Sequence, residues 1–368
     1  MKVLVTGSNG FIGKNIVVRL GEMAGYEAIG FDLEDSLAEL SELVAQADAV
    51  VHLAGVNRPT DVKDFAKGNA DLTLHLCELI AATGRKIPLI ISSSIQAGLA
   101  NPYGESKREA ELAGEALAKN TGNPVSIYRL PGVFGKWCRP NYNSVVATFC
   151  HNIANDLPIQ ISDPGAVLKL VYVDDVVSEF VRALSAMPAG LSRGEVSKVF
   201  AITLGDLAIQ IEAFRNCRES LISECVGTGL VRALYATYLS YLPPIKFAYD
   251  LPKYGDERGV FVEMLKTKDS GQFSFFTAHP GITRGGHYHH TKTEKFLVIK
   301  GAAHFRFRHV VTNERYEVFT SGDNPQVVET VPGWTHDITN VGEDEMVVML
   351  WANEIFDRDR PDTIAAKV

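Results

Sequence analysis

The feature that most restricts the fold of this chain is a short apolar run followed by three evenly spaced glycines. Residues 3–6 read Val-Leu-Val-Thr, and Gly7, Gly10 and Gly13 follow with the spacing G-x-x-G-x-x-G. Glycines at these places let the backbone turn tightly and approach a pyrophosphate, whose charge faces the N-terminus of the next helix. The segment therefore predicts a strand, a phosphate-binding turn and a helix that hold a dinucleotide. The predicted coenzyme ligands in this turn are Gly7, Asn9, Gly10, Phe11, Ile12 and Gly13.

An acidic residue, Asp32, follows the next predicted strand, about 20 residues beyond the glycines. In dinucleotide-binding units such a carboxylate accepts hydrogen bonds from the adenosine ribose hydroxyls, which favours NAD over NADP. The alternative is that Asp32 closes a turn or caps the next helix. Asp35 and Ser36 lie nearby, however, and could do the capping instead.

Short apolar runs alternate with amphipathic stretches in the first half of the chain. Strands that alternate with helices predict a parallel sheet covered on both faces, that is, a Rossmann-like doubly wound α/β domain. The predicted strands are residues 3–6, 27–31, 49–53, 89–92 and 125–129. The predicted helices are residues 13–20, 37–45, 69–82 and 106–120.

The pattern changes after residues 205–241, which read as helical and are followed by Pro243-Pro244. From Phe247 onward, short strand-like runs are separated by Gly, Pro, Asn and Asp, which predicts an all-β jelly-roll barrel. We therefore expect two domains, residues 1–243 and 244–368, in agreement with the length of the chain. The predicted strands of the second domain are residues 261–265, 272–277, 295–299, 303–309, 316–320 and 346–351.

Composition excludes several classes of function. The net charge of -8 argues against a general nucleic-acid binder. The five cysteines are scattered without C-x-x-C spacing, which argues against a disulfide framework and favours a reducing compartment. No signal peptide precedes the first strand, and no apolar run approaches the roughly 20 residues that span a bilayer. We therefore expect a cytoplasmic protein with neither nucleic-acid nor membrane partners.

Tyr103 and Lys107 are separated by four positions, which on a helix places both side chains on one face. The Lys107 ammonium would stabilise a phenolate and lower the pKa of Tyr103, so that Tyr103 could exchange a proton with a carbonyl or an alcohol. Ser92, Ser93 and Ser94 end the preceding predicted strand, and a serine hydroxyl there could polarise the same carbonyl.

His287 and His289 form an H-x-H pattern, which on a strand places both side chains on the same side. Glu294 comes five residues after His289, and His336 follows beside a later turn. Three imidazoles and a carboxylate make a ligand set suited to Zn²⁺, Mn²⁺, Fe²⁺ or Ni²⁺. As alternatives, each histidine could be structural, and His290 could replace a neighbour.

The first domain resembles the extended short-chain dehydrogenase/reductase family. The resemblance rests on the glycine turn, on Y-x-x-x-K, and on residues 52–55, 129–135 and 172–175, which read His-Leu-Ala-Gly, Arg-Leu-Pro-Gly-Val-Phe-Gly and Tyr-Val-Asp-Asp. It implies that the catalytic residues are Ser94, Tyr103 and Lys107. It also implies that the coenzyme contacts Leu53, Ala54, Gly55, Tyr103 and Lys107.

Members of this family mostly act on nucleotide-sugars, so the resemblance implies a sugar-nucleotide near residues 129–144. Each candidate ligand there could instead be a solvated loop residue. The candidates are Arg129, Lys136, Arg139, Asn141 and Asn143.

Residues 281–301 and 332–340 resemble the two motifs of the cupin family, G-x5-H-x-H-x4-E-x6-G and P-G-x-x-H-x3-N. This resemblance implies a divalent metal, with zinc the expected ion. Some sugar cupins instead use histidines as bases without any metal. The implied ligands are His287, His289, Glu294 and His336.

Taken together, the two halves resemble bifunctional nucleotide-sugar enzymes of capsular-polysaccharide synthesis. The segments concerned are residues 50–59, 92–107, 134–150, 235–243, 281–301 and 351–363. The resemblance implies that the cupin domain epimerises C3 of a UDP-linked 4-keto amino sugar and that the reductase domain reduces its C4 ketone. NADPH is the implied reductant, and Asp32 leaves NADH open.

The alternative is a reductase whose cupin domain is a structural or regulatory module. If the cupin domain is an epimerase, its C3 base stays open among several residues. Homodimers are common in both families, so the resemblance also implies a homodimer. The candidate bases are Lys266, His279, Tyr288 and Lys292.

Overall fold

The computed structural model describes residues 1–57, 59, 61 and 63–368, so Arg58, in the segment 50–59, lies outside the described residues. The described chain divides into two compact units. The first contains Met1–Ile211 and Arg232–Pro243, and the second contains Glu212–Val231 and Pro244–Val368. The chain thus leaves the first unit for the last time after Pro243, where the sequence suggests a boundary, but residues 212–231 also group with the second unit.

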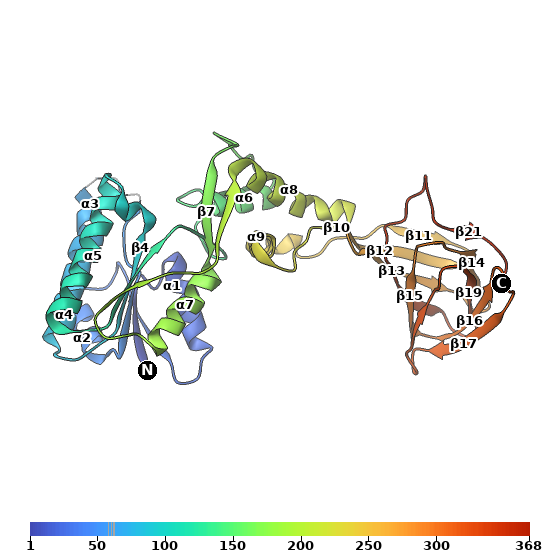
Figure 1. The fold of residues 1–368 in the computed structure, drawn as a ribbon, viewed down its shortest axis with the longest axis horizontal. Coiled ribbons are helices and arrows are strands. Elements are labelled where there is room, and N and C mark those ends of the chain that lie inside the picture. The colour runs from blue at the N-terminus through green and yellow to red at the C-terminus, as the bar shows by residue number, and fades with distance from the viewer. Residues whose placement is uncertain (58, 60, 62) are drawn as a thin grey trace. The chain divides into compact units, whose positions relative to one another are not determined.

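A parallel sheet forms the centre of the first unit (Figure 1). Among the described residues its strands follow the order β2-β1-β3-β4-β5-β8, and every neighbouring pair is parallel. The predicted doubly wound α/β fold is confirmed. The order reverses between β1 and β3, and open α/β sheets bind ligands beyond the carboxyl ends of the strands at such a point. The strands are β1 (Lys2–Thr6), β2 (Glu27–Phe31), β3 (Ala49–His52), β4 (Leu89–Ser94), β5 (Val125–Leu130) and β8 (Leu191–Gly194).

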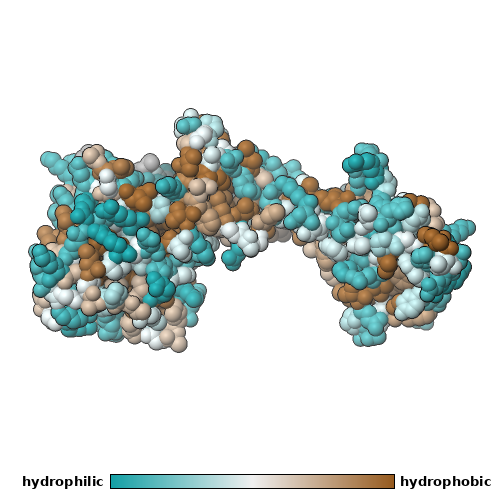
Figure 2. All heavy atoms as spheres, in the orientation of Figure 1, coloured by the Kyte–Doolittle hydropathy of each residue, from teal (hydrophilic) through white to brown (hydrophobic). Residues whose placement is uncertain are grey.

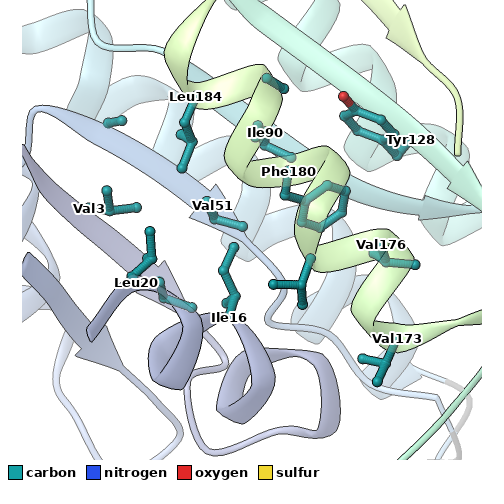
Figure 3. Close-up of a cluster of buried hydrophobic side chains, with 14 of the residues drawn as sticks. Val3, Ile16, Leu20, Val51, Ile90, Tyr128, Val173, Val176, Phe180 and Leu184 are labelled. Atoms are coloured by element: carbon teal, nitrogen blue, oxygen red, sulfur yellow. The ribbon is translucent and has the colours of Figure 1, made fainter. Parts of the chain in front are cut away.

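Helices cover both faces of this sheet. Val3 and Val5 of β1 pack in one apolar cluster with Ile16 of α1 (Phe11–Gly21) and Phe180 of α7 (Val173–Ser185) (Figure 3). Leu4, between them, belongs to the cluster on the other face. Because successive strand residues point to opposite faces, this alternation shows that the strand is buried on both sides. The helices on the second face are α2 (Leu37–Gln46), α4 (Leu72–Ala82) and α5 (Pro102–Thr121).

Three predicted helical stretches differ in detail. The helix predicted over residues 106–120 begins earlier, at Pro102 of α5. Residues 69–82 begin within a π-helical turn, η1 (Ala66–Asp71), before α4. Residues 205–241 form α8 (Leu204–Ser220) and α9 (Gly229–Leu239), with the short strand β10 (Ile222–Ser223) between them. Leu221 and Gly229 have positive φ angles, of 61° and 64°, which a continuous helix does not accommodate. A smaller sheet of β6 (Gly132–Phe134), β7 (Val167–Tyr172) and β9 (Val199–Thr203), and the helix α6 (Val145–Ala154), complete the unit.

The second unit is built from two β-sheets, as the predicted jelly roll requires. One has the order β10-β12-β13-β20-β15-β18, with β11 beside β12, and the other has the order β17-β16-β19-β14-β21. Phe276 and Phe296 from the first sheet and Phe305 and Ile338 from the second share one buried cluster, so the core lies between the sheets. The strands of the first sheet are β11 (Lys253–Asp256), β12 (Gly259–Thr267), β13 (Gly271–Ala278), β15 (Glu294–Lys300), β18 (Val327–Glu329) and β20 (Met346–Ala352). Those of the second are β14 (Thr283–Tyr288), β16 (Ala302–His309), β17 (Arg315–Ser321), β19 (Trp334–Asn340) and β21 (Ile364–Ala365).

Hydrophilic and hydrophobic side chains are interspersed over the visible face of each unit (Figure 2). In the described part of the chain, no helix combines the length and the apolar character that crossing a membrane requires.

Candidate active sites

The glycine turn connects β1 to α1 and packs closely against the chain after β3. Gly7 has a φ angle of 69°, in the region that favours glycine. A Cβ atom at Gly7 would lie 2.8 Å from the amide nitrogen of Ala54, and one at Gly13 would lie 2.0 Å from the carbonyl oxygen of Gly7. Side chains would therefore prevent this turn from closing. The structure brings the glycine turn together with Leu53 and Ala54.

Asp32 lies directly after β2 and its carboxylate holds the glycine turn. Its Oδ2 atom accepts a hydrogen bond from the backbone amide of Asn9 at 2.6 Å. Helix α2 is capped by Ser36, whose hydroxyl accepts from the Glu39 amide at 3.3 Å in a reciprocal capping box. The cap is therefore Ser36, and the carboxylate of Asp32 lies at the turn expected to bind the coenzyme.

A chain of buried hydrogen bonds supports the region behind the turn. His52 Nδ1 lies 2.7 Å from the Thr6 hydroxyl, and His52 Nε2 lies 2.8 Å from the Thr73 hydroxyl. The side chain of Asn69, in the π-helical turn, donates to the Ser106 hydroxyl of α5 at 3.0 Å. Burial, followed by the charge of Lys107, lowers the pKa of His52 to about 3, so this imidazole is neutral. These bonds connect the segment after β3 with helix α5 in one polar network.

Helix α5 begins just before the predicted catalytic tyrosine. Asn101 caps the helix by accepting a hydrogen bond from the Gly104 amide at 2.8 Å, and Pro102 occupies the first turn. Tyr103 is therefore in the first turn, and Lys107 is one turn further along the same face.

The structure brings Lys107 close to the loop after β3. Its side chain is buried, and its Nζ atom donates to the Ser92 carbonyl at 3.4 Å. A Cβ atom at Gly55 would lie 3.0 Å from this nitrogen, so glycine leaves room for the ammonium group. Ser94 ends β4, and its side chain forms a hydrogen bond with the Tyr103 side chain. The structure therefore brings Ser94 together with Tyr103, and Lys107 together with Gly55.

The pKa of Tyr103 is shifted in the direction opposite to the one predicted from the sequence. Burial raises the pKa of Tyr103, and a hydrogen bond with Ser94 opposes this shift without reversing it. The prediction that Lys107 would lower this pKa is wrong for this structure, because desolvation of the phenolate outweighs the favourable contacts. Burial also lowers the pKa of Lys107 to about 8. Tyr103 is consequently held as a neutral phenol, the form that donates a proton.

A cavity of about 760 Å³ in the first unit is lined by some of the predicted substrate ligands. Asn141 and Asn143 line it, beside the start of α6 and the segment that follows that helix. Asn141 has a φ angle of 53°, and its backbone amide donates to the Thr148 hydroxyl at 3.0 Å, which fixes the loop. The other lining residues are Tyr142, Ser144, Val145, Thr148, Phe149, Asn152, Pro158, Ile159 and Gln160.

The cationic substrate candidates do not line this cavity. Arg129 forms a two-pronged ion pair with the buried carboxylate of Glu111, at 2.8 and 2.7 Å. Lys136 Nζ lies 2.6 Å from Asp174 Oδ1, and the Arg139 guanidinium lies over the ring of Tyr142. Tyr142 itself lines the cavity, so Arg139 is the cation that the structure connects to it.

In the second unit, the structure brings the four predicted metal ligands together. One ligand atom from each of His287, His289, Glu294 and His336 lies within 4.8 Å of all the others. His287 of β14 is paired with His336 of β19, so sheet register fixes their separation. His289 follows the end of β14, and Glu294 begins β15. Burial, followed by the nearby His336, lowers the pKa of His287 to about 4.

The orientation of two imidazoles tests whether this cluster fits a metal ion. The Nδ1 atoms of His289 and His336 face the carbonyl oxygens of Asp362 and Trp334, at 2.5 and 3.4 Å. A carbonyl oxygen only accepts, so each ring carries its proton on Nδ1 and a lone pair on Nε2.

The Nε2 atoms of both rings face the Glu294 carboxylate, which is also a hydrogen-bond acceptor. Glu294 Oε2 lies 3.1 Å from His289 Nε2 and 3.5 Å from His336 Nε2. His336 Nε2 is buried and has no hydrogen-bond partner among the described residues. Lone pairs facing a carboxylate repel it unless a cation lies between them. Nitrogen and oxygen donors in this arrangement fit a divalent metal ion such as Zn²⁺.

A cavity of about 140 Å³ lies against this cluster, with His287, Glu294 and His336 in its wall. None of the four candidate C3 bases is among the residues that line it. Lys292 Nζ is bound to Glu294 Oε1 at 3.0 Å, and Lys266 Nζ is bound to Glu263 at 2.8 Å. The rest of the wall consists of Phe261, Phe276, Arg284, Gly285, Phe296, Phe305, Asp337, Ile338 and Leu350.

Sequence reasoning missed two residues of this region. Arg284 lines the cavity, three positions before His287 and inside the motif, so its placement near the ligands could have been inferred. Asp362 holds the loop after His289: its carboxylate accepts from the backbone amides of His290, Thr291 and Lys292 at 2.7 to 2.9 Å. No local pattern connects Asp362 with a histidine so distant in sequence.

The fold and the site define a nicotinamide-dependent enzyme of the α/β class. Residues 3–197 match the NAD dependent epimerase/dehydratase family, and residues 254–364 match the polysaccharide biosynthesis C-terminal domain. The chain belongs to the NAD dependent epimerase/dehydratase family, and this membership supports a nicotinamide coenzyme.

One relative is similar over the whole chain. It is the UDP-2-acetamido-2,6-beta-L-arabino-hexul-4-ose reductase of Pseudomonas aeruginosa PA103, with 57% identity over 368 residues, covering 100% of this chain and 99% of that protein. The crystal structure of the capsular polysaccharide assembling protein CapF from Staphylococcus aureus is 42% identical, covers 100% of both chains and has a TM-score of 0.93. A UDP-glucuronic acid 4-epimerase from Bacillus cereus in complex with NAD is 19% identical, covers 66% of this chain and 98% of its own, and has a TM-score of 0.55, which shows the fold alone. The expected resemblance to a two-domain enzyme of capsular-polysaccharide synthesis is confirmed.

Proposed function

We propose that this chain reduces the C4 ketone of a UDP-linked 4-keto-2-acetamido-2,6-dideoxy-hexose for surface-polysaccharide synthesis. The observation that supports the proposal most directly is the half-buried, neutral Tyr103 beside Ser94 and Lys107, behind a glycine turn shaped for a dinucleotide. The full-length similarity to a UDP-sugar 4-ulose reductase supports the substrate class. The product would be UDP-2-acetamido-2,6-dideoxy-L-talose, on the route to UDP-N-acetyl-L-fucosamine.

The reduction needs a hydride at C4 and a proton at the C4 oxygen. The coenzyme supplies the hydride when bound. The Tyr103 hydroxyl donates the proton to the oxygen as the new C–H bond forms, and a solvent proton restores the phenol. The Ser94 hydroxyl polarises the carbonyl. Lys107, one helical turn from Tyr103, would contact the bound coenzyme, as the family resemblance implies.

The choice of coenzyme depends on Asp32. The carboxylate already accepts from the Asn9 amide, and it would repel a 2′-phosphate placed at the same turn. NADPH is the coenzyme that the family resemblance implies, whereas this geometry supports NADH. Both therefore belong in the test.

The sugar-nucleotide would occupy the cavity of about 760 Å³ in the first unit. Asn141 and Asn143 offer amide donors and acceptors, and Arg139 lies over the ring of Tyr142 in its wall. A cation and amides of this kind match a diphosphate and hydroxyl groups. Arg129 and Lys136 are occupied by Glu111 and Asp174, so they would support the site and would not bind the sugar directly.

We further propose that residues 244–368 invert the configuration at C3 before the reduction in residues 1–243. A ketone at C4 makes the neighbouring C3 proton acidic, so a base can remove it and return a proton from the opposite face. A divalent metal, expected to be zinc, would be held by His287, His289, Glu294 and His336, and would supply positive charge beside the substrate.

The substitution Tyr103→Phe separates the two reactions. The full-length variant, loaded with metal, should lose oxidation of NADPH and NADH with the UDP-4-keto sugar by about 10²-fold or more. In D₂O without coenzyme, it should still exchange the C3 proton at the rate of the unaltered protein. Tyr26→Phe, remote from the trio on the loop before β2, is a matched control that should keep both activities.

The possible results decide between the candidate functions. No oxidation of either coenzyme by folded, metal-loaded wild-type protein would refute the reductase proposal. Reduction without C3 exchange would favour the second candidate, a reductase whose metal-binding domain is structural or regulatory. The buried cluster, which does not itself require a substrate, is the observation behind that candidate.

A further inference from the structure

The cavity beside the metal cluster contains a cation that the proposed function has not used. Arg284, on β14, lines this cavity together with His287, Glu294 and His336. Aromatic side chains form much of the remaining wall, among them Phe261 and Phe276. An arginine in such surroundings keeps its charge, because a guanidinium does not lose its proton in proteins.

Arg284 has unusually few polar partners. Its Nε atom donates to the Thr277 carbonyl at 3.0 Å, and its guanidinium lies 5.2 Å over the ring of Phe276. Its Nη2 atom is buried and has no hydrogen-bond partner among the described residues. Among the described residues no carboxylate forms an ion pair with it, although Arg258 and Asp256 are near enough to interact with it electrostatically.

Neighbouring arginines of the same unit are paired. Arg306 forms two hydrogen bonds with Asp337, at 2.9 and 2.6 Å, and Asp337 also lines the cavity. Arg258 forms an ion pair with Asp256, in which Nη2 lies 2.5 Å from Oδ2. Asp337 and Asp256 are thus each neutralised by another arginine. Arg284 is half-buried, and a cation whose buried Nη2 atom has no acceptor is costly, which suggests that a ligand provides the missing partner.

We propose that Arg284 binds the C4 oxygen of the 4-keto sugar and stabilises the enolate that forms during C3 epimerisation. The inference rests on the proposed epimerase function of residues 244–368. When a base removes the C3 proton, the electrons of the C3–H bond form a C3=C4 double bond, and the carbonyl π electrons move to the C4 oxygen. Reprotonation of C3 on the opposite face restores the ketone, so no oxidant or reductant is consumed.

The Arg284 guanidinium binds the enolate oxygen more strongly than it binds the oxygen of the starting ketone. A ketone oxygen is neutral, whereas the enolate oxygen is negative, so Arg284 binds the intermediate more strongly than the substrate. Such a difference accelerates the reaction, because binding that increases along the reaction path lowers the barrier. The apolar wall excludes water and strengthens the interaction.

The test compares C3 proton exchange in D₂O by full-length, metal-loaded protein without coenzyme. Arg284→Gln should lower the rate constant for exchange by about 10²-fold with a smaller change in substrate affinity, and Arg284→Lys should recover part of the loss. Reduction of a C3-inverted substrate, a reaction assigned to the other domain, should stay unchanged. Arg315→Gln, an exposed arginine of β17, is the matched control and should exchange at the wild-type rate.

The outcomes separate this inference from the proposed function. Exchange by Arg284→Gln within twofold of wild type would overturn the role of Arg284 and leave the epimerase intact. No exchange by wild type would overturn both. Because the removed charge has no protein counter-ion, Arg284→Gln should not lower the melting temperature. If it fails to fold, Arg284→Lys decides, since an unchanged exchange rate in that variant would contradict a requirement for the guanidinium group.

Discussion

The backbone carbonyl of Asp362 accepts a hydrogen bond from Nδ1 of His289 at 2.5 Å. This bond fixes the ring so that Nε2 faces Glu294. The Asp362 carboxylate, in turn, is held by the backbone amides of residues 290–292. One residue near the C-terminus therefore sets both the orientation of a predicted metal ligand and the path of the loop that follows it.

Replacing Asp362 should weaken metal binding. In Asp362→Ala the amides lose their acceptor and the carbonyl that orients His289 is less firmly placed, so metal affinity should fall by about 10–100-fold. Competition with a chromophoric chelator measures the affinity directly, without any assay of activity. Asp359→Ala, in the same segment but exposed, is the control. Equal affinities for both variants would refute the positioning role.

Removal of the proposed metal ion should lower the stability of the second unit. The lone pairs of His289 and His336 and the Glu294 carboxylate would then face one another without a cation. Dialysis against EDTA should lower the melting temperature of that unit by several degrees, as loss of a ligand specific to the folded state does. Zn²⁺ should restore it. His336→Ala should melt at the same temperature with and without EDTA, and an undiminished response in this variant would contradict the ligand set.

Coenzyme binding should depend on the absence of a side chain at Gly13. A methyl group there would lie 2.0 Å from the carbonyl oxygen of Gly7, so Gly13→Ala must open the turn. We expect the dissociation constant for NAD(P)H to rise by at least about tenfold, or about 1.4 kcal/mol. Gly21→Ala, at the end of the same helix with open space around the new methyl group, should bind normally. Calorimetric titration gives both constants.

Coenzyme preference should respond to the charge of Asp32. Asp32→Asn removes the repulsion of a 2′-phosphate but keeps a side chain able to accept from Asn9. The ratio of kcat/KM for NADPH to that for NADH should rise by about tenfold, equivalent to about 1.4 kcal/mol. The neighbouring exposed Glu34→Gln has the same charge change and should leave the ratio as it is. A ratio unaffected by Asp32→Asn would place the ribose elsewhere.

Glu111 should contribute to stability in a pH-dependent way. Burial raises its pKa, but hydrogen bonds from Arg129, Ser93 and Arg108 outweigh this and hold the pKa at about 2, below the ordinary 4.5. A carboxyl with a depressed pKa stabilises the folded state fully above pH 4.5, and the contribution disappears as the pH falls toward 2.

Glu111→Gln should therefore destabilise the first unit at pH 7 by about 1–3 kcal/mol, since the arginine partners are partly exposed. The difference from wild type should shrink in acid. Urea unfolding at pH 7 and at pH 3.5 tests this. Glu22→Gln, which removes an exposed pair with Arg19, should change stability by no more than about 0.5 kcal/mol at either pH. A difference for Glu111→Gln that stays constant with pH would refute the explanation.

The sequence predicts best what depends on local pattern. Val3 to Thr6 is a continuous apolar run bounded by a glycine turn, and the strand begins and ends within one residue of that prediction. The helix over 205–241 was overpredicted, because periodicity does not reveal that Leu221 and Gly229 adopt positive φ angles. The helix predicted over residues 106–120 begins earlier, at Pro102, because Asn101 caps it, and this local signal was overlooked.

Contacts between residues far apart in the sequence could not be predicted from local patterns. The four predicted metal ligands meet because β14 pairs with β19, and a pattern of histidines suggested this meeting without showing the register. Arg129 illustrates the opposite case. It lies next to the expected sugar site in sequence, but Glu111 on the neighbouring helix binds its guanidinium, and no spacing rule identifies that pair.

The passage of the chain between the two units has an evolutionary consequence. Residues 212–231 are built into the second unit, and residues 232–243 return to the first, so no single cut releases both units whole. A fragment that began at Pro244 would lack β10, which pairs with β12. A recombination event that exchanged one domain for a homologue at a single breakpoint would leave the other with a foreign segment. The two units are therefore inherited as a pair, and a change of specificity in either one arises most readily by substitution within the existing chain.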